Sequence, residues 1–502
     1  MRLALSLLGA LLIGVAPGQV WEKPIAPGLM LRSEFDAAAP RLIHALRITP
    51  GAPGLKLMGE LAGGTINEEG TVKGRIGPSK IAQQAKAVAA INADFFSFDH
   101  GAPIGLMARN GELLTSPARN RAVFAWGEAT KFGVPSFKAS LTDENGLNLA
   151  LDGINQPVGQ NQLVLYTSAA GNVEISSENL MAFVKVEDSI LRPNATMSGT
   201  VDYLLADSRK MTVPAGKVLL VARGTKTQAL SALRPERKLR IRTETQGFDW
   251  NAVENAIGGG PFLLRNGNLA VDAEAQGFNA AFSNTRHPRT AVGVTKHGDI
   301  WLVAIDGRQS MSVGASLKET AEVMLGLGCV DAMNLDGGGS TNLHLLGVTV
   351  NRPSDKAERP VSNALLVFAP ITSGSAPKIV VPERIEVGST AMARLFVDQK
   401  EVPPGEVVWG MQGAGWIDQG GMVKGFEIGK GLLSGSYLGT SASTTIDILA
   451  VGSLRKLPVV TVTTLPPPPA KRTPKKVRSK TKRPPIISAT VRPLFRKKVK
   501  AH

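Results

Sequence analysis

The sequence predicts an α+β protein in which a mixed β-sheet domain with few helices precedes a small all-β sandwich and a basic tail. Three observations lead to this prediction. The 502 residues are 43% hydrophobic, which is enough for two to four domains with apolar cores. Short apolar runs separated by turn residues, including 54 Gly and 32 Pro, outnumber segments with helical periodicity. From Leu465 onward the chain is rich in Pro, Lys and Arg instead.

The first half of the larger domain contains both kinds of periodicity. Residues 41–48 alternate between apolar and polar side chains in the manner of a strand. Pro78 opens a short helix that we expect to run to about Ala87, with Ser79 as its N-cap. Two apolar runs, 290–295 and 300–305, flank a Lys-His-Gly-Asp turn and predict a β-hairpin.

A second helix is marked by its capping residues. Ser316 and Glu319 have the spacing of a capping box, in which each side chain bonds the other residue's backbone N–H. The helix that follows is expected to end near Gly326 or Gly328. The next apolar run, 330–335, predicts a strand.

Two further regions are predicted to consist of strands. Residues 120–250 hold several short apolar runs split by Gly, Asn and Asp, and they contain no recognisable chemical motif. Residues 373–463 carry regularly spaced strand signals around Trp409 and resemble bacterial immunoglobulin-like domains. The predicted order is therefore a larger domain over 19–372 and a sandwich over 373–463.

The two ends of the chain predict export and disorder. Residues 1–18 combine Arg2, a short apolar stretch and small residues, which is typical of a signal peptide and too short to span a membrane. We therefore expect a periplasmic, cell-surface or extracellular protein. Residues 464–502 contain 13 Lys or Arg and no Asp or Glu, which predicts a disordered tail that contacts anionic wall polymer or a membrane surface.

The composition also excludes several classes of protein. Without the tail the net charge falls from +16 to +3 (44 basic and 41 acidic residues), so the folded part has no character of a nucleic-acid binder. Cys329 is the only cysteine, which excludes an intrachain disulfide and a cysteine zinc cluster. No Gly-x-x-x-x-Gly-Lys-Ser/Thr loop occurs, which argues against a nucleoside triphosphatase.

Three apolar runs end in aspartate, at Asp94, Asp306 and Asp336. A carboxyl group at the end of a buried strand is half shielded, and partial burial tunes its pKa for acid or base chemistry. A single Asp-Gly pair is more often a simple turn. Three such ends with Asn, Arg or Phe beside them favour a functional site.

The sequence also contains two triple-glycine turns, Gly258 to Gly260 and Gly337 to Gly339, and the second directly follows Asp336. Successive backbone N–H groups in such turns can bind an anion, although either turn alone is more simply explained as a tight connection. Arg289, Arg308 and Arg359 fall beside the same segments, and arginine binds phosphate through two parallel N–H groups.

Six motifs in this order resemble those of the phosphodiester glycosidase family. They span about Arg41 to Phe368 and consist of Asn92-Ala93-Asp94-Phe95-Phe96, Ala256-Ile257-Gly258-Gly259-Gly260-Pro261, Arg289-Thr290-Ala291-Val292-Gly293, Asp306-Gly307-Arg308, Asn334-Leu335-Asp336-Gly337-Gly338-Gly339-Ser340 and Arg359-Pro360-Val361-Ser362-Asn363.

The resemblance implies a hydrolase that cleaves a sugar-1-phosphodiester at the glycosidic bond and releases free sugar and a phosphomonoester. Asp336 and Asp306 are the expected catalytic carboxylates. Arginines and glycine N–H groups would hold the phosphate, and asparagines would bind sugar hydroxyls. The expected substrate-binding residues are Asn92, Asp94, Gly259, Gly260, Arg289, Arg308, Asn334, Gly337, Gly338, Gly339, Ser340, Arg359 and Asn363.

Two other functions remain open from the sequence. The protein could be a non-catalytic envelope protein that binds carbohydrate. It could also be a phosphodiesterase that cuts the P–O bond, with Asp306 and Asp336 as oxygen ligands of Mg²⁺ or Ca²⁺. No cofactor is expected for the phosphodiester glycosidase. A divalent cation is expected only for the phosphodiesterase. The expected partner is a sugar phosphate or a cell-wall glycan, without specific nucleic acid binding.

Overall fold

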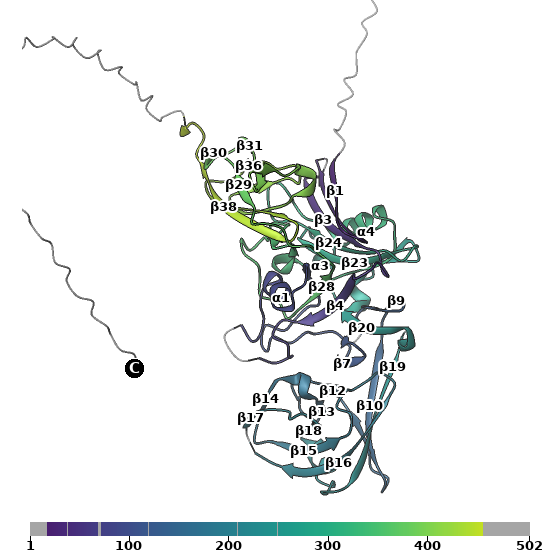
Figure 1. Ribbon diagram of the computed structural model, residues 1–502. Helices are drawn as coiled ribbons and strands as arrows, with labels where there is room; N and C mark the ends of the chain where they lie inside the picture. The colour runs from purple at the N-terminus through teal and green to yellow at the C-terminus, as the bar shows by residue number, and fades with distance from the viewer. Residues whose placement is uncertain are drawn as a thin grey trace, which may run out of the picture. The chain divides into compact units, whose positions relative to one another are not determined.

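Figure 1 shows the computed structural model, which describes residues 18–454 except 38, 69–71, 119, 208 and 248. The predicted signal peptide, apart from Gly18, and the basic tail lie outside the described residues. Most elements are strands, and the α-helices of the described chain are short. This agrees with the predicted mixed β-sheet domain with few helices.

The largest sheet of the core brings distant segments of the chain together. The central strand β3 (Arg41–Ile48) pairs with β2 on one side and β24 on the other, which explains why nearly all of its side chains are buried. The hairpin of β23 and β24 is confirmed. In spatial order the strands are β1 (Gln19–Ala26), β2 (Leu29–Asp36), β3, β24 (Ile300–Ile305), β23 (Arg289–Thr295), β25 (Cys329–Asn334), β21 (Phe262–Arg265) and β22 (Asn268–Leu269).

Two five-stranded sheets complete this core. One contains β27 (Val348–Thr349), β26 (Leu343–Leu345), β5 (Ala89–Asn92), β28 (Asn363–Phe368) and β4 (Lys56–Leu61). The other contains β7 (Glu112–Thr115), β6 (Met107–Arg109), β20 (Val253–Gly258), β8 (Val123–Gly127) and β9 (Thr130–Gly133). One hydrophobic cluster includes side chains from all three sheets, among them Leu46, Ile91 and Phe124. The sheets therefore share one core.

The β-rich prediction for residues 120–250 is confirmed. Most of this region is an insertion between β9 and β20, two strands of one sheet. Its eight strands, in spatial order, are β11 (Asn148–Leu151), β10 (Ser136–Asp143), β19 (Lys238–Gln246), β16 (Thr196–Leu205), β15 (Asn179–Val186), β18 (Lys217–Arg223), β13 (Leu163–Tyr166) and β12 (Gly153–Ile154). A separate pair, β14 (Asn172–Ile175) and β17 (Arg209–Thr212), accompanies it. Helix α2 (Thr225–Leu230) lies in the same insertion.

The capping prediction is right for one helix and wrong for the other. Helix α4 (Leu317–Gly326) begins with the complete Ser316–Glu319 capping box. Helix α1 (Pro78–Ala85) instead has Gly77 as its N-cap, because the carboxylate of Glu358 accepts the Ser79 N–H at 3.1 Å. Glu358, which is distant in the sequence, thus bonds the first turn of the helix in place of the Ser79 hydroxyl. No helix of the described chain, including α3 (Ala280–Asn284), could cross a membrane.

The strands after Lys378 form three small sheets around a separate hydrophobic cluster that contains Trp409. The immunoglobulin-like assignment and the domain boundaries stay predictions. The sheets are β29 (Lys378–Val380), β32 (Arg394–Val397) and β33 (Lys400–Glu401); β30 (Arg384–Glu386), β38 (Thr440–Leu449), β37 (Gly429–Tyr437) and β34 (Val408–Gly413); and β31 (Thr390–Met392), β36 (Met422–Gly425) and β35 (Gly415–Ile417).

A buried lysine fastens this C-terminal β unit, residues 378–449, to the N-terminal strand β1. The Lys23 ammonium group donates hydrogen bonds to the carbonyl oxygens of Pro404, Val407 and Gln419, at 2.9 Å and 2.6 Å for the first and last. Burial lowers the pKa of Lys23 to about 8, and the charge of Asp418 opposes this shift. Burying an ammonium group is costly, so its three carbonyl partners must offset the lost hydration.

We expect the substitution Lys23→Met to lower the free energy of unfolding by about 2–4 kcal/mol, because three buried carbonyl oxygens would lose their donor. Urea unfolding followed by tryptophan fluorescence measures the change. The control is Lys400→Met at an exposed lysine of β33, for which we expect no loss. Equal stability of the two variants would contradict this account of Lys23.

Candidate active site

The three aspartates follow strand ends as predicted, but they do not form one site. Asp94 follows β5, Asp306 follows β24, and Asp336 follows β25. The charges of Asp94 and Asp336 influence each other, and both carboxyls lie near Arg121. Asp306 instead interacts with Arg352 and its neighbours. The structure therefore separates the two residues that we predicted as a catalytic pair.

Asp336 is the aspartate of the site that solvent can reach. The residue is partly exposed, whereas Asp94 and Asp306 are each only 1% exposed. Burial raises the pKa of Asp336 to about 6, against the opposing effects of the Ser340 hydroxyl, the Arg359 charge and the Gly337 N–H. A carboxyl group with this pKa titrates close to neutral pH, as a group that exchanges protons in catalysis must.

Asp94 lies in a pocket shaped by backbone atoms. Its carboxylate accepts hydrogen bonds from the backbone N–H groups of Phe95 (2.8 Å) and Gly105 (2.7 Å). A methyl group at Gly258 or Gly105 would stand only 2.7 Å from the Asp94 carboxylate oxygen, so this packing requires glycine at both positions. Burial raises the pKa of Asp94 to about 7 despite these N–H groups and Arg121.

Arg121 is a site residue that the sequence analysis missed. Its guanidinium carbon lies 4.5 Å from the ring centre of Phe278 and 4.9 Å from that of Phe95. One terminal nitrogen, NH1, is buried without a hydrogen-bond partner in the described chain. Two aromatic rings thus hold a cation beside both carboxyls. Arg121 lies outside every motif, so no sequence signal distinguishes it from other arginines.

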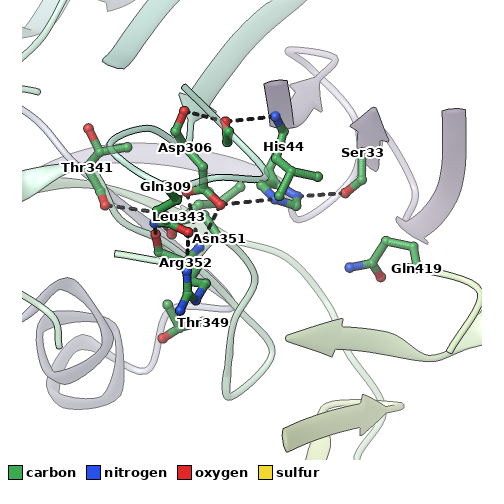
Figure 2. Close-up of polar contacts among 12 residues, drawn as sticks. Ser33, His44, Asp306, Gln309, Thr341, Leu343, Thr349, Asn351, Arg352 and Gln419 are labelled. Atoms are coloured by element: carbon green, nitrogen blue, oxygen red, sulfur yellow. Dashed lines mark hydrogen bonds and ion pairs between the residues drawn. The ribbon is translucent and has the colours of Figure 1, made fainter. Parts of the chain in front are cut away.

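The Asp306 carboxylate, which we predicted to be catalytic, is part of a buried network of polar contacts (Figure 2). Its carboxylate accepts hydrogen bonds from the Asn351 side chain at 3.0 Å and from the Arg352 backbone N–H at 2.9 Å. His44 Nε2 lies 3.9 Å from Asp306 Oδ2, and the Ser33 hydroxyl lies 3.0 Å from His44 Nδ1. Burial raises the pKa of Asp306 to about 7. The carboxylate faces protein groups and not solvent.

Three asparagines that we expected to bind sugar hydroxyls instead fix the backbone of the site. The Asn92 side chain donates to the Asp336 carbonyl oxygen at 2.6 Å and accepts from Thr290 and from the Asn342 N–H. Asn363 accepts the Asp94 N–H at 2.9 Å.

Asn334 donates to the carbonyl oxygens of Gly260 and Leu335, and its own carbonyl oxygen is buried without a partner in the described chain. All three asparagines are fully buried, so they position the aspartates.

Two N–H groups of the glycine turn after Asp336 already have protein partners. The Gly338 N–H donates to the Pro288 carbonyl oxygen at 2.8 Å, and the Gly337 N–H lies beside the Asp336 carboxyl. Gly339 packs against Arg359, so that any side chain there would collide with the guanidinium group. Ser340 is buried beside Asp336. Substrate binding by Gly337, Gly338, Gly339 and Ser340 stays a prediction.

The turn at Gly259 and Gly260 is likewise occupied by protein contacts. The Gly259 N–H donates to the Ala122 carbonyl oxygen at 3.1 Å, and the Gly260 N–H donates to the Asn334 carbonyl oxygen at 2.7 Å. Gly260 has a φ of +108°, which a residue with a side chain rarely adopts. This turn therefore holds the end of β25 in place and offers no free N–H to an anion.

The three arginines near the motifs have different surroundings. Arg289 is buried and donates through Nε and one terminal nitrogen to the carbonyl oxygens of Ala315, Phe282 and Thr285, and its role as a phosphate ligand stays a prediction. Arg308 is exposed, and one of its terminal nitrogens lies 3.3 Å from His287 Nδ1.

Arg359 bonds Asp355 at 2.9 Å and lowers the pKa of Asp336. Arg308 and Arg359 therefore flank the Gly338–Gly339 turn with two accessible cations.

No group of three or more His, Cys, Asp or Glu side chains in the described part of the chain is arranged to hold a metal ion. A pocket of about 730 Å³ lies in the insertion, with Asp143, Lys185 and Arg240 in its walls, and none of the site residues lines it. The site is thus defined by its carboxyls and arginines.

Part of this chain is similar in sequence to known proteins. Residues 180–368 match the model of the phosphodiester glycosidase family. The bovine N-acetylglucosamine-1-phosphodiester alpha-N-acetylglucosaminidase is 34% identical over 137 residues, which are 24% of this chain and 26% of that enzyme. The human enzyme is 32% identical over 136 residues, again 24% and 26%. The chain thus matches about a quarter of the length of these relatives.

Solved structures extend the similarity. A hypothetical protein from Synechocystis is 29% identical with a TM-score of 0.58, over 68% of this chain and 62% of that one. A Burkholderia pseudomallei protein, described as exported, has the same fold with 24% identity and a TM-score of 0.54, over 67% and 74%. Asp306, Asp336, Arg308 and Arg359 lie inside the matched residues 180–368, whereas Asp94 and Arg121 lie outside them. Over residues 180–368 the chain is therefore similar to the phosphodiester glycosidase family.

Proposed function

We propose that this protein hydrolyses a sugar-1-phosphodiester at the bond between the anomeric carbon and the phosphate oxygen. The observation that carries the proposal is the pair Asp94 and Asp336, two carboxyls with raised pKa values beside the cation Arg121. The match of residues 180–368 to the phosphodiester glycosidase family supports the same chemistry. Water would add its hydroxyl group to the sugar and its proton to the departing phosphate, giving free sugar and a phosphomonoester.

The two carboxyls have environments that suit different roles. Asp336, with the lower pKa and partial exposure, would be ionised and act at the anomeric carbon. Asp94 keeps its proton up to about pH 7 because it is buried, and it would be the acid partner. Two carboxyls whose environments separate their pKa values are the usual basis of such a division.

The arginines near the two carboxyls would bind the phosphate. Arg308 and Arg359 flank the turn after Asp336, and Arg121 is close enough to Asp94 and Asp336 to interact with the charges of both. An arginine bonds two phosphate oxygens at once, and its charge stabilises the negative charge that develops on the leaving group. The proposal thus replaces Arg289 by Arg121 among the phosphate ligands.

We propose further that the protein is exported and acts on a glycan of the cell envelope or outside the cell. The apolar N-terminal pattern and the basic tail support this proposal. Release of the mature protein into the periplasm or medium, detected by an antibody, tests it, and a protein found only in the cytoplasm would contradict it.

We expect Asp336→Asn to reduce free-sugar release from a panel of sugar-1-phosphodiesters at least about a thousandfold, because the amide cannot act at the anomeric carbon. The control is Asp331→Asn on the preceding strand β25, where the carboxyl contacts Asn266 and Arg265. Wild-type protein that binds members of the panel without releasing sugar would favour a carbohydrate-binding protein instead.

The pH profile of kcat/KM should be bell-shaped. The rate rises as pH increases through about 6, where Asp336 loses its proton, and falls above about 7, where Asp94 loses its own. In Asp94→Asn the alkaline limb should disappear, since the amide does not ionise. A profile that is unchanged in this variant would show that Asp94 is not the acid.

We expect Arg308→Ala to raise KM for the phosphodiester about tenfold and to leave hydrolysis of a neutral aryl glycoside of the same sugar unchanged. The control Arg286→Ala removes an exposed arginine that pairs with Glu319, and it should change neither substrate's kinetics. An equal effect of Arg308→Ala on both substrates would mean that Arg308 does not bind the phosphate.

A further inference from the structure

Two adjoining pockets outside the carboxyl site form one groove. The first has a volume of about 320 Å³, and its walls include Ile104, Ser116 and Gln156. The second, of about 380 Å³, has Lys73, Tyr166 and Lys210 in its walls. Both pockets also have His100 and Pro157 in their walls, so these two residues join them. Residues 154–157 belong to the insertion, and 100–116 to the core.

One wall of the groove, at Ile104, adjoins Gly105, which contacts Asp94. The Gly105 N–H bonds the Asp94 carboxylate, and the preceding N–H, of Ile104, bonds the Phe95 carbonyl oxygen at 2.9 Å. Phe96 and Pro103 form a β-bridge that closes the loop between them. One wall of the groove is therefore built on the same backbone that holds the buried carboxyl. The groove therefore lies beside the residues that hold Asp94.

The lining has the character of a saccharide site. Ile104 is 41% exposed and, with Pro103 and Pro157, supplies apolar surface of the kind that sugar ring faces cover. Gln156 accepts from the Ser116 hydroxyl at 3.1 Å, and its NH2 group makes no hydrogen bond in the described structure. The Nδ1 atom of His100 is buried and also has no partner there. A few polar groups on an apolar wall are typical of small-molecule sites.

The charges of the groove favour a neutral ligand. The walls of the second pocket carry both acidic and basic side chains, so that they have no uniform charge to attract a polyanion. These residues are Glu68, Lys73, Asp99, Glu174 and Lys210. A neutral sugar chain has hydroxyl groups that can bond either kind of charge.

We propose that this groove binds a neutral oligosaccharide portion of the substrate, as a subsite beyond the reacting sugar phosphate. The inference rests on the proposed function for the identity of the reacting group, but sugar binding in the groove can be measured without any turnover. It implies that the substrate is a glycan rather than a sugar nucleotide or a small sugar phosphate.

The experiment measures binding of maltotriose, cellotriose and chitotriose to the full chain by saturation-transfer NMR, without a phosphodiester present. We expect saturable binding of at least one of them, weakened about fivefold or more in Ile104→Ala and in Gln156→Ala. The control Ile190→Ala removes an isoleucine that is 38% exposed at another surface, and it should retain wild-type affinity.

No binding of any trisaccharide, or binding that is equal in Ile104→Ala, Gln156→Ala and Ile190→Ala, would overturn the proposal. Using two groove variants guards against one that fails to fold, and circular dichroism checks each of them. Loss of sugar release in the phosphodiester assay together with intact trisaccharide binding would count against the proposed function alone. The two failures are therefore distinguishable.

Discussion

The arrangement of the site depends on one buried interaction, the hydrogen bonds between Asp306 and the segment Asn351–Arg352 (Figure 2). Asn351 also donates to the Thr341 carbonyl oxygen and accepts the Leu343 N–H at 2.7 Å. It thereby fixes the segment that follows the Asp336 turn. A carboxylate that loses its hydration needs several donors, and here those donors come from the segment that must be held still. Asp306 thus holds the segment next to the Asp336 turn in place.

The same segment connects the C-terminal β unit to the core. The Arg352 guanidinium donates to the Gly413 carbonyl oxygen, and Gln412 donates to the carbonyl oxygens of Thr349 and Asn351. Lys23 adds a second attachment at β1. The C-terminal strands belong to the same compact unit as the core and support the segment beside the site. Their contribution to stability should therefore extend to the geometry around Asp336.

The sequence predicted the local structure of the site well and its side-chain roles poorly. Strand ends at Asp94, Asp306 and Asp336 follow from apolar runs, and the α4 capping box follows from two residues at a fixed spacing. Roles depend instead on which partners the fold supplies. Arg289 was expected to bind phosphate, yet backbone carbonyl groups use its donors, and such groups leave no pattern in a sequence. Arg121 became recognisable only through Phe95 and Phe278, which are distant in the chain.

We propose that the protein breaks the bond between the sugar and the phosphate oxygen. In this reaction carboxyls would act at the anomeric carbon, and arginines would bind the leaving group. The most direct test is hydrolysis of a sugar-1-phosphodiester in water labelled with ¹⁸O, followed by mass spectrometry of both products. The account predicts the label in the free sugar and none in the phosphomonoester. Label in the phosphate would mean cleavage of the P–O bond and would contradict it.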